Sequence, residues 1–84
     1  MSPVANTIVW RFGGSEVILT GEFDNWSASK KMVKKGTDFV APQVLGEFKF
    51  IVDGIWRCSL DYATVFDKQG NVNNTLKRRK RILK

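Results

Sequence analysis

The nine residues KFIVDGIWR, Lys49 to Arg57, place an Asp-Gly pair between two runs of bulky side chains. An Asp-Gly pair in this setting is a strong hairpin signal, because a two-residue type I′ turn requires positive φ at both of its central positions. We therefore predict that Asp53 and Gly54 form a tight turn. The flanking residues, 47–52 and 55–58, should then form two antiparallel strands whose register follows by counting outward from the turn.

The predicted register sorts the side chains of this hairpin onto two faces, because successive side chains of a strand point to opposite sides. One face is apolar and is expected to lie in the core; it holds Phe48, Phe50, Val52 and Ile55. The other face holds Lys49, Ile51, Trp56 and Cys58. A lysine is almost never buried without a partner, so this second face is expected to meet solvent. Trp56 should then be exposed, on a diagonal from Lys49.

Most of the remaining chain also alternates with a period of two between clusters of Gly, Asp and Asn, which indicates strands. In TIVWRF, Trp10 shares a face with Ile8 and Phe12 and is expected in the core. We expect the other strands at 16–23, 31–34 and 39–44 and from Thr75 onward, with 67–74 as a loop. Pro42 cannot donate to a ladder, so its strand should lie at an edge or carry a bulge.

No segment has the spacing of a helical stripe, and the short, regularly spaced strands predict an all-β fold. We expect an antiparallel β-sandwich of about seven short strands, with a small barrel as the alternative. The 84 residues suffice for one domain.

The net charge of +6 resides at the C-terminal end of the chain. Residues 77–84, KRRKRILK, hold six basic residues and no acidic one, whereas residues 1–76 hold eight of each. We therefore divide the chain into a neutral body, 1–76, and a basic tail, 77–84. A basic groove across the body is not expected.

The composition argues against an enzyme and against a metal or cofactor site. Histidine is absent and Cys58 is the only cysteine, so the common metal ligands and general bases are missing. Asp24, Asp53, Asp61 and Asp67 fit turns better than a glycosidase pair. The chain shows neither a signal peptide nor a membrane-spanning run, which favours an intracellular, cytoplasmic setting; the basic tail makes the nucleus the alternative.

An exposed tryptophan beside a lysine has two interpretations. The lysine stem can simply cover the indole, a contact that needs no functional explanation. Alternatively, the indole is a flat platform for the C–H face of a glucose ring, with Lys49 donating to its hydroxyls. Trp26, after the turn in EFDNWS, could supply a second ring, and the amides of Asn73 and Asn74 both donate and accept, although these residue types are also common in turns.

The chain resembles carbohydrate-binding module family 48, and within it the glycogen-binding domain of AMP-activated protein kinase beta subunits. The likeness runs from about Thr7 to Leu76 and rests on VWRFGGSEVILTGEFDNWS, GEFKFIVDGIW and GNVNN, in the order and near the spacing of the family. It implies an immunoglobulin-like β-sandwich that binds α-1,4-linked glucan such as glycogen or starch. The family's two stacking tryptophans, its lysine and its asparagine then fall on Trp26, Trp56, Lys49 and Asn73, and the neighbouring amides suggest secondary contacts from Gln69, Asn71 and Asn74.

The resemblance has departures. The family's loop often carries a leucine over the sugar, followed by glycine and threonine, whereas this chain has Gln69, Gly70 and Asn71. An apolar cap is therefore not implied, and we expect weaker binding. The regulatory serine of the kinase subunit is also missing, since KKMVKKG offers no hydroxyl.

These observations predict a non-catalytic glucan-binding module that targets an associated kinase, phosphatase or glucan enzyme to polysaccharide. The alternative is a module that binds nucleic acid or another anionic partner through the tail, by Lys77, Arg78, Arg79, Lys80 and Arg81.

Overall fold

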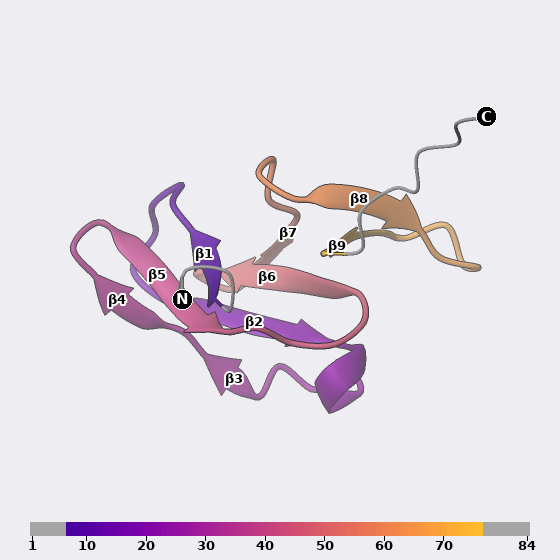
Figure 1. Ribbon diagram of the computed structural model, residues 1–84, viewed down its shortest axis with the longest axis horizontal. Coiled ribbons are helices and arrows are strands. Elements are labelled where there is room, and N and C mark those ends of the chain that lie inside the picture. Colours follow the sequence, from indigo (N-terminus) through magenta and orange to yellow (C-terminus); the bar gives the residue numbers. More distant parts are fainter. Residues whose placement is uncertain (1–6, 77–84) are drawn as a thin grey trace, which may run out of the picture.

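The computed structural model describes residues 7–76, and in this range the chain forms nine strands and one 3-10 turn (Figure 1). The 3-10 turn, η2, spans Glu22–Asp24. The strands are β1 (Thr7–Trp10), β2 (Val17–Gly21), β3 (Lys30–Lys31), β4 (Val33–Lys35), β5 (Asp38–Pro42), β6 (Phe48–Val52), β7 (Ile55–Arg57), β8 (Ala63–Phe66) and β9 (Val72–Thr75). The basic tail lies outside the described residues.

The strands belong to two antiparallel sheets. One sheet has the order β1-β5-β4, and the other has the order β3-β2-β6-β9-β8, with β7 paired to β6. The predicted all-β fold and antiparallel sandwich are therefore confirmed, with nine strands in place of about seven. Since the strands fall into two separate sheets, the barrel alternative is wrong.

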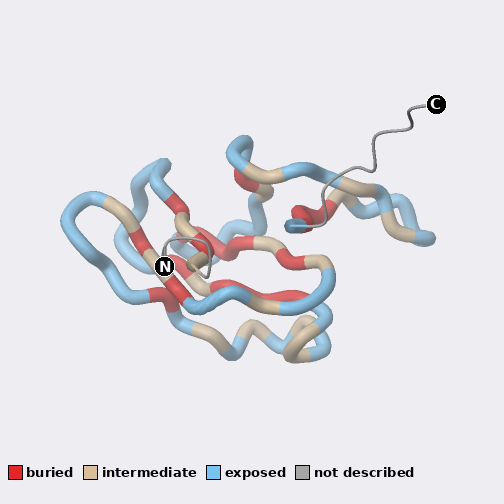
Figure 2. The backbone as a smooth tube through the Cα atoms, in the orientation of Figure 1, coloured by how far each residue is buried: buried red, intermediate tan, exposed pale blue. Residues whose placement is uncertain are grey.

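The core lies between the two sheets (Figure 2). In β1 and β5 buried residues alternate with more exposed ones, whereas β2 and β6 are buried at four of their five positions. Ile8, Trp10 and Phe39 enter it from the first sheet, and Phe48 and Phe50 from the second. The rings of Trp10 and Phe50 have centroids 5.0 Å apart, so they join the two sheets directly. Trp10 is 1% exposed, as predicted, and its indole N–H donates to the Gly13 carbonyl at 2.9 Å.

The predicted strand at 31–34 is divided between the two sheets. β3 pairs with β2, and β4 pairs with β5. Met32 lies between them, is 5% exposed, and donates its N–H to the Val17 carbonyl at 2.9 Å. One short segment therefore crosses from one sheet to the other, and the apolar Met32 side chain fills the core where it crosses.

The Asp-Gly hairpin has the predicted turn and register. Both turn residues have positive φ, 52° at Asp53 and 88° at Gly54. β6 and β7 pair Val52 with Ile55, Ile51 with Trp56 and Phe50 with Arg57. The Asp53 carboxylate also accepts the backbone N–H of Ser15 at 2.9 Å and that of Glu16 at 2.8 Å. The turn therefore also fastens the loop between β1 and β2.

Two burial predictions for the hairpin are wrong. Ile55, expected in the core, is 63% exposed, because β7 is a three-residue strand outside the main strand order and the core does not extend to its first residue. Ile51, placed on the wet face, is 8% exposed. It pairs with Ile18 on one side and with Trp56 on the other, and these bulky neighbours shield it from water.

Three further predictions need correction. Phe12 is 40% exposed and follows the end of β1, although its ring packs edge-on against Trp10. The strand that contains Pro42 is not at an edge, since β5 lies between β1 and β4; the proline is simply its last residue. The final strand is Val72–Thr75, so Asn73 and Asn74 lie in a strand and not in a loop.

Candidate functional site

A surface pocket of about 430 Å³ brings together Trp26, Lys49, Trp56 and Asn73, the four residues that the sequence predicts as the main sugar contacts. The full set of lining residues is Trp26, Lys49, Trp56, Asp67, Gln69, Asn71 and Asn73. They come from the loop after β2, from the paired strands β6 and β7, and from the β8–β9 hairpin. In Figure 1, η2 and the β8–β9 loop lie at the same end of the molecule, which is where these segments converge.

Trp26 lies in a loop that is held by the carboxylate of Asp24. One oxygen of Asp24 accepts the Thr20 hydroxyl at 2.9 Å and the Gly21 N–H at 3.0 Å, and the other accepts the N–H and hydroxyl of Ser29 at 2.9 and 2.8 Å. Trp26 itself donates its N–H to the Gly21 carbonyl at 2.8 Å and has a φ of 60°. A left-handed tryptophan is uncommon, and here the surrounding hydrogen bonds hold it in place.

The pKa of Asp24 shows the balance of forces in this loop. Desolvation raises the pKa of the carboxyl, but the hydrogen bonds from Gly21, Ser29 and Thr20 together favour the charged form more strongly, so the net pKa is well below its ordinary value. Asp24 therefore stays ionised at neutral pH and keeps the Trp26 loop closed.

Gly21 is the position where this loop meets β6, and no larger residue fits there. A Cβ at Gly21 would collide with the Glu47 carbonyl oxygen and come within 2.8 Å of the Phe48 Cα. The Glu22 N–H donates to that same carbonyl at 2.9 Å. The close approach of the two backbones thus places the Trp26 loop against the strand that carries Lys49.

Trp56 and Lys49 lie on adjacent strands and have polar groups free for a ligand. Trp56 is 48% exposed and pairs with Ile51, which provides an apolar base for the indole. Among residues 7–76, neither the Trp56 indole N–H nor the Lys49 ammonium makes a hydrogen bond or ion pair. The prediction that Lys49 and Trp56 share an accessible surface is therefore confirmed.

The loop between β8 and β9 is built around Asp67. Its Oδ1 accepts the backbone N–H groups of Gln69 and Asn71, both at 2.9 Å. Its Oδ2 accepts the side-chain amides of Asn71 at 3.1 Å and Asn73 at 3.4 Å. Gly70, with a φ of 87°, completes the turn. The hydrogen bond from the Asn71 N–H, followed by smaller contributions from the other amides, lowers the pKa of Asp67 despite some desolvation.

Asn73 is 3% exposed and its amide is held in one orientation. Its Nδ2 donates to Glu47 Oε1 at 3.0 Å as well as to Asp67. Because both partners are carboxylates, which only accept, the nitrogen must face them. The amide oxygen of Asn73 accepts no hydrogen bond from the described part of the chain.

Asn74, predicted as a secondary contact, does not reach the pocket. It is fully buried, its oxygen accepts the Ser59 N–H at 2.7 Å, and its nitrogen donates to the Ser59 carbonyl at 3.0 Å. Longer bonds to the carbonyls of Tyr62 and Ala63 complete the set. The Asn74 side chain satisfies backbone groups of the β7–β8 connection. Because successive side chains of a strand point to opposite faces, it lies on the other side of β9 from the Asn73 side chain.

Sequence reasoning misses the carboxylates around the pocket. Asp67 is predicted as a turn residue, which its backbone contacts confirm, but it also lines the pocket; Glu47, from the β5–β6 connection, has no predicted role and yet bonds Asn73. The available signal is the spacing of Asp67, Asn71 and Asn73 across a polar loop. Since these residue types are common in turns, that spacing cannot distinguish a site from a simple turn.

The pocket suits an uncharged, hydroxyl-rich ligand. Two indoles offer apolar surface, amides and one ammonium offer hydrogen bonds, and Lys49 and Asp67 balance each other in charge. Among residues 7–76, no three His, Cys, Asp or Glu side chains are grouped to hold a metal ion. Within the same residues no helix has the length and apolarity needed to cross a membrane.

Comparisons with known proteins identify similar chains. The family model for the glycogen recognition site of AMP-activated protein kinase matches residues 4–83. The chain is 41% identical over 78 residues to the 5'-AMP-activated protein kinase subunit beta of Schizosaccharomyces pombe, covering 88% of this chain and 26% of that protein. It is 39% identical over 77 residues to the SNF1-related protein kinase regulatory subunit beta-1 of Arabidopsis thaliana, covering 87% of this chain and 27% of that one.

A further relative has a different name. The chain is 39% identical over 79 residues to Cruciform DNA-recognizing protein 1 of Saccharomyces cerevisiae, covering 83% of this chain and 17% of that protein. The chain spans about a quarter of the length of the kinase-subunit relatives that it matches.

Proposed function

The chain belongs to the family of glycogen recognition domains of AMP-activated protein kinase, and from this premise we propose that it is a non-catalytic module that binds α-1,4-linked glucan. The observation that carries the proposal is the single pocket surface shared by Trp26, Lys49, Trp56 and Asn73. These are the residues that the family resemblance implies as glucan contacts.

Each residue has a role that follows from its chemistry. Trp26 and Trp56 stack on the C–H faces of glucosyl units, which are apolar and flat. Lys49 donates to ring hydroxyls, since its ammonium is otherwise unoccupied among residues 7–76. Asn73 offers its oxygen as an acceptor, because its nitrogen is held by Glu47 and Asp67. Gln69 and Asn71 extend the polar wall of the pocket.

The test is a titration of the protein with maltoheptaose, followed by NMR. We expect saturable shifts centred on the pocket and a dissociation constant between micromolar and millimolar, which corresponds to about −8 to −4 kcal/mol. Trp56→Ala should weaken binding by about 2 kcal/mol, or roughly thirtyfold, as truncated aromatic anchors do. Leu60→Ala is the matched control, because Leu60 is 90% exposed and does not line the pocket. A folded wild-type protein that shows no saturable shift would disprove the proposal.

We further propose that the module brings an associated kinase, phosphatase or glucan enzyme to polysaccharide inside the cell. The support is the similarity to beta subunits of protein kinases, of which the chain covers about a quarter. If this is right, the protein that carries this chain should co-sediment with glycogen together with a catalytic partner, and Trp56→Ala should release both into the supernatant.

The alternative of nucleic-acid binding has less support from the described residues. Lys49 is the only cation among them that lines the pocket, and Asp67 opposes it. The tail proposed to bind anions lies outside the described residues, and the DNA-recognizing relative shares 17% of its length with this chain. Binding of duplex DNA measured with and without residues 77–84, across a salt series, distinguishes the cases. Binding that persists without the tail would favour the alternative.

A further inference from the structure

The carboxylate of Asp67 forms hydrogen bonds with all three of the other pocket-lining residues between β8 and the end of β9, Gln69, Asn71 and Asn73. Asp67 Oδ1 closes the loop by accepting the N–H groups of Gln69 and Asn71 at 2.9 Å. Two backbone hydrogen bonds reinforce the closure, from the Asp67 N–H to the Asn71 carbonyl at 2.9 Å and from the Gly70 N–H to the Asp67 carbonyl at 3.0 Å. The backbone of the loop is thereby fixed by contacts within five residues of chain.

The second oxygen of Asp67 acts on side chains. It accepts Asn71 Nδ2 at 3.1 Å and Asn73 Nδ2 at 3.4 Å, and Glu47 accepts Asn73 Nδ2 at 3.0 Å. An asparagine amide has two N–H donors and one carbonyl oxygen. With both donors of Asn73 directed at carboxylates, only its oxygen remains for a ligand. Asn71, bound through its nitrogen, likewise keeps its oxygen free within residues 7–76.

We propose that Asp67 is a positioning residue for glucan: it holds Asn71 and Asn73 so that the pocket offers the sugar acceptor oxygens on this wall. Lys49 lies on β6, which pairs with β9, and its ammonium group donates hydrogen bonds where the asparagine oxygens accept them. A ring hydroxyl can then donate to an asparagine oxygen while an adjacent hydroxyl accepts from Lys49. This inference rests on the proposed function. Asp67 lines the pocket, and it also contributes to binding by orienting Asn71 and Asn73.

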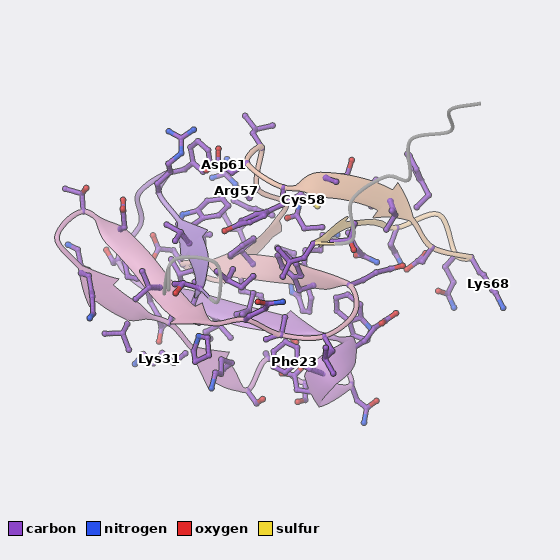
Figure 3. All side chains as sticks on the ribbon, viewed as in Figure 1. Phe23, Lys31, Arg57, Cys58, Asp61 and Lys68 are labelled. Carbon is purple, nitrogen blue, oxygen red and sulfur yellow. The ribbon has the colours of Figure 1, made fainter. Side chains whose placement is uncertain are left out.

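The Asp67 carboxylate closes the loop backbone and also orients the side-chain amides of Asn71 and Asn73. The variant Asp67→Asn distinguishes these two effects. The asparagine oxygen can still accept the backbone N–H groups of Gln69 and Asn71, so the turn should persist. Its new NH₂ group would face the side-chain amides of Asn71 and Asn73, which donate, and one of these amides must rotate or move away. Asp67→Ala removes both effects. Lys68→Ala is the matched control, because Lys68 is exposed at the tip of the same loop and points away from it (Figure 3).

The experiment titrates all four proteins with maltoheptaose by NMR and records their side-chain amide signals without ligand. We expect Asp67→Asn and Asp67→Ala to bind at least about tenfold more weakly than wild type, and Lys68→Ala to bind like wild type. In Asp67→Asn the backbone signals of Gln69 and Asn71 should change little, whereas the Asn73 side-chain amide should shift. That combination distinguishes positioning from loss of loop structure.

Failure of the positioning role of Asp67 can be distinguished from failure of glucan binding itself. If wild type binds and both Asp67 variants bind equally well, the positioning role is refuted and the glucan proposal stands. If wild type does not bind, the glucan proposal fails first, and the positioning role for sugar fails with it. An unchanged Asn73 amide signal in Asp67→Asn would refute the role whether or not sugar binds.

Discussion

Two turns of this molecule each contain an aspartate and a glycine with positive φ, and they differ in which backbone groups the aspartate carboxylate binds. At the β6–β7 turn, Gly54 has a φ of 88°, and at the β8–β9 loop, Gly70 has a φ of 87°. In each turn an aspartate carboxylate accepts two backbone N–H groups. Those accepted by Asp53 belong to Ser15 and Glu16 in a distant loop, whereas those accepted by Asp67 belong to its own loop.

The difference shows how one residue type can serve stability or binding. The carboxylate oxygens of Asp53 accept N–H groups from the β1–β2 loop, which is remote in sequence. Asp53 therefore connects that loop to the hairpin and supports the fold. Asp67 directs one oxygen to its own turn and the other to asparagines that line the pocket. We therefore expect changes at the first turn to lower stability and changes at the second to lower glucan affinity.

The largest effect should follow from Asp53→Ala. The substitution removes the acceptor for Ser15 and Glu16 and places alanine at a φ of 52°, so we expect the free energy of unfolding to fall by about 2 kcal/mol. Asp53→Asn should lose less, because asparagine tolerates positive φ and retains an acceptor oxygen. Urea unfolding measures both. A folded Asp53→Ala protein that bound maltoheptaose much more weakly than wild type would contradict the division between the two turns.

A matched glycine pair gives an intermediate effect. A Cβ added at Gly54 or at Gly70 would meet no atom within 4 Å, so alanine at either position introduces strain without a clash. We expect each variant to lose about 1 kcal/mol of stability, as alanine at positive φ does. Only Gly70→Ala should also weaken maltoheptaose binding, since the loop can relieve strain by moving Gln69 and Asn71. Equal affinities in the two variants would mean that the loop shape does not matter.

The smallest expected effect is the pH dependence of glucan binding, which should be absent near neutral pH and appear only in acid. Asp67 and Asp24 both have pKa values below those of unfolded carboxyls, through the hydrogen bonds that outweigh their desolvation. Their stabilisation is therefore complete above about pH 4, the ordinary carboxyl range, and is lost as the pH falls through the folded-state values. Maltoheptaose affinity should therefore be level from about pH 7 to about pH 4, and it should decline only where the pH falls through the lowered folded-state pKa values.

The acid experiment needs its own controls. Other charged groups lie near this end of the pocket: Glu47 bonds Asn73, Glu22 accepts the Glu47 N–H, and Lys49 lines the pocket with Asp67. Circular dichroism at each pH must therefore show that the protein is folded. Asp67→Asn should bind weakly at all of these pH values and show a flatter profile. A wild-type affinity that stayed unchanged as the pH fell through the lowered pKa of Asp67, with the protein still folded, would contradict the role of that carboxylate.

Much of the fold follows from local patterns. The Asp-Gly pair predicted the turn and the register of β6 with β7, and the alternation along β1 and β6 predicted Trp10, Phe48 and Phe50 as core residues. The sequence predicts the pocket members Trp26, Lys49, Trp56 and Asn73 together: Lys49 and Trp56 follow from the hairpin count, and Trp26 and Asn73 follow from residue type together with the family resemblance.

The β8–β9 hairpin could not be predicted in the same way. Asn73 and Asn74 are polar residues typical of turns, yet both are buried in β9 because partners distant in sequence satisfy their amides. Glu47 bonds Asn73, and Ser59 bonds Asn74 in both directions. A sequence pattern does not contain those partners, so it assigns such residues to loops.

Local sequence is sufficient to predict the all-β class, the Asp-Gly hairpin with its register, and the inward position of Trp10, Phe48 and Phe50, because each depends on neighbours along the chain or across one tight turn. The exposure of Ile55, the burial of Ile51 and the choice of Asn71 and Asn73 over Asn74 as pocket residues depend on the packing of the two sheets. Those outcomes depend on which strands become neighbours and which carboxylates come within hydrogen-bonding distance, and both are settled when the two sheets pack.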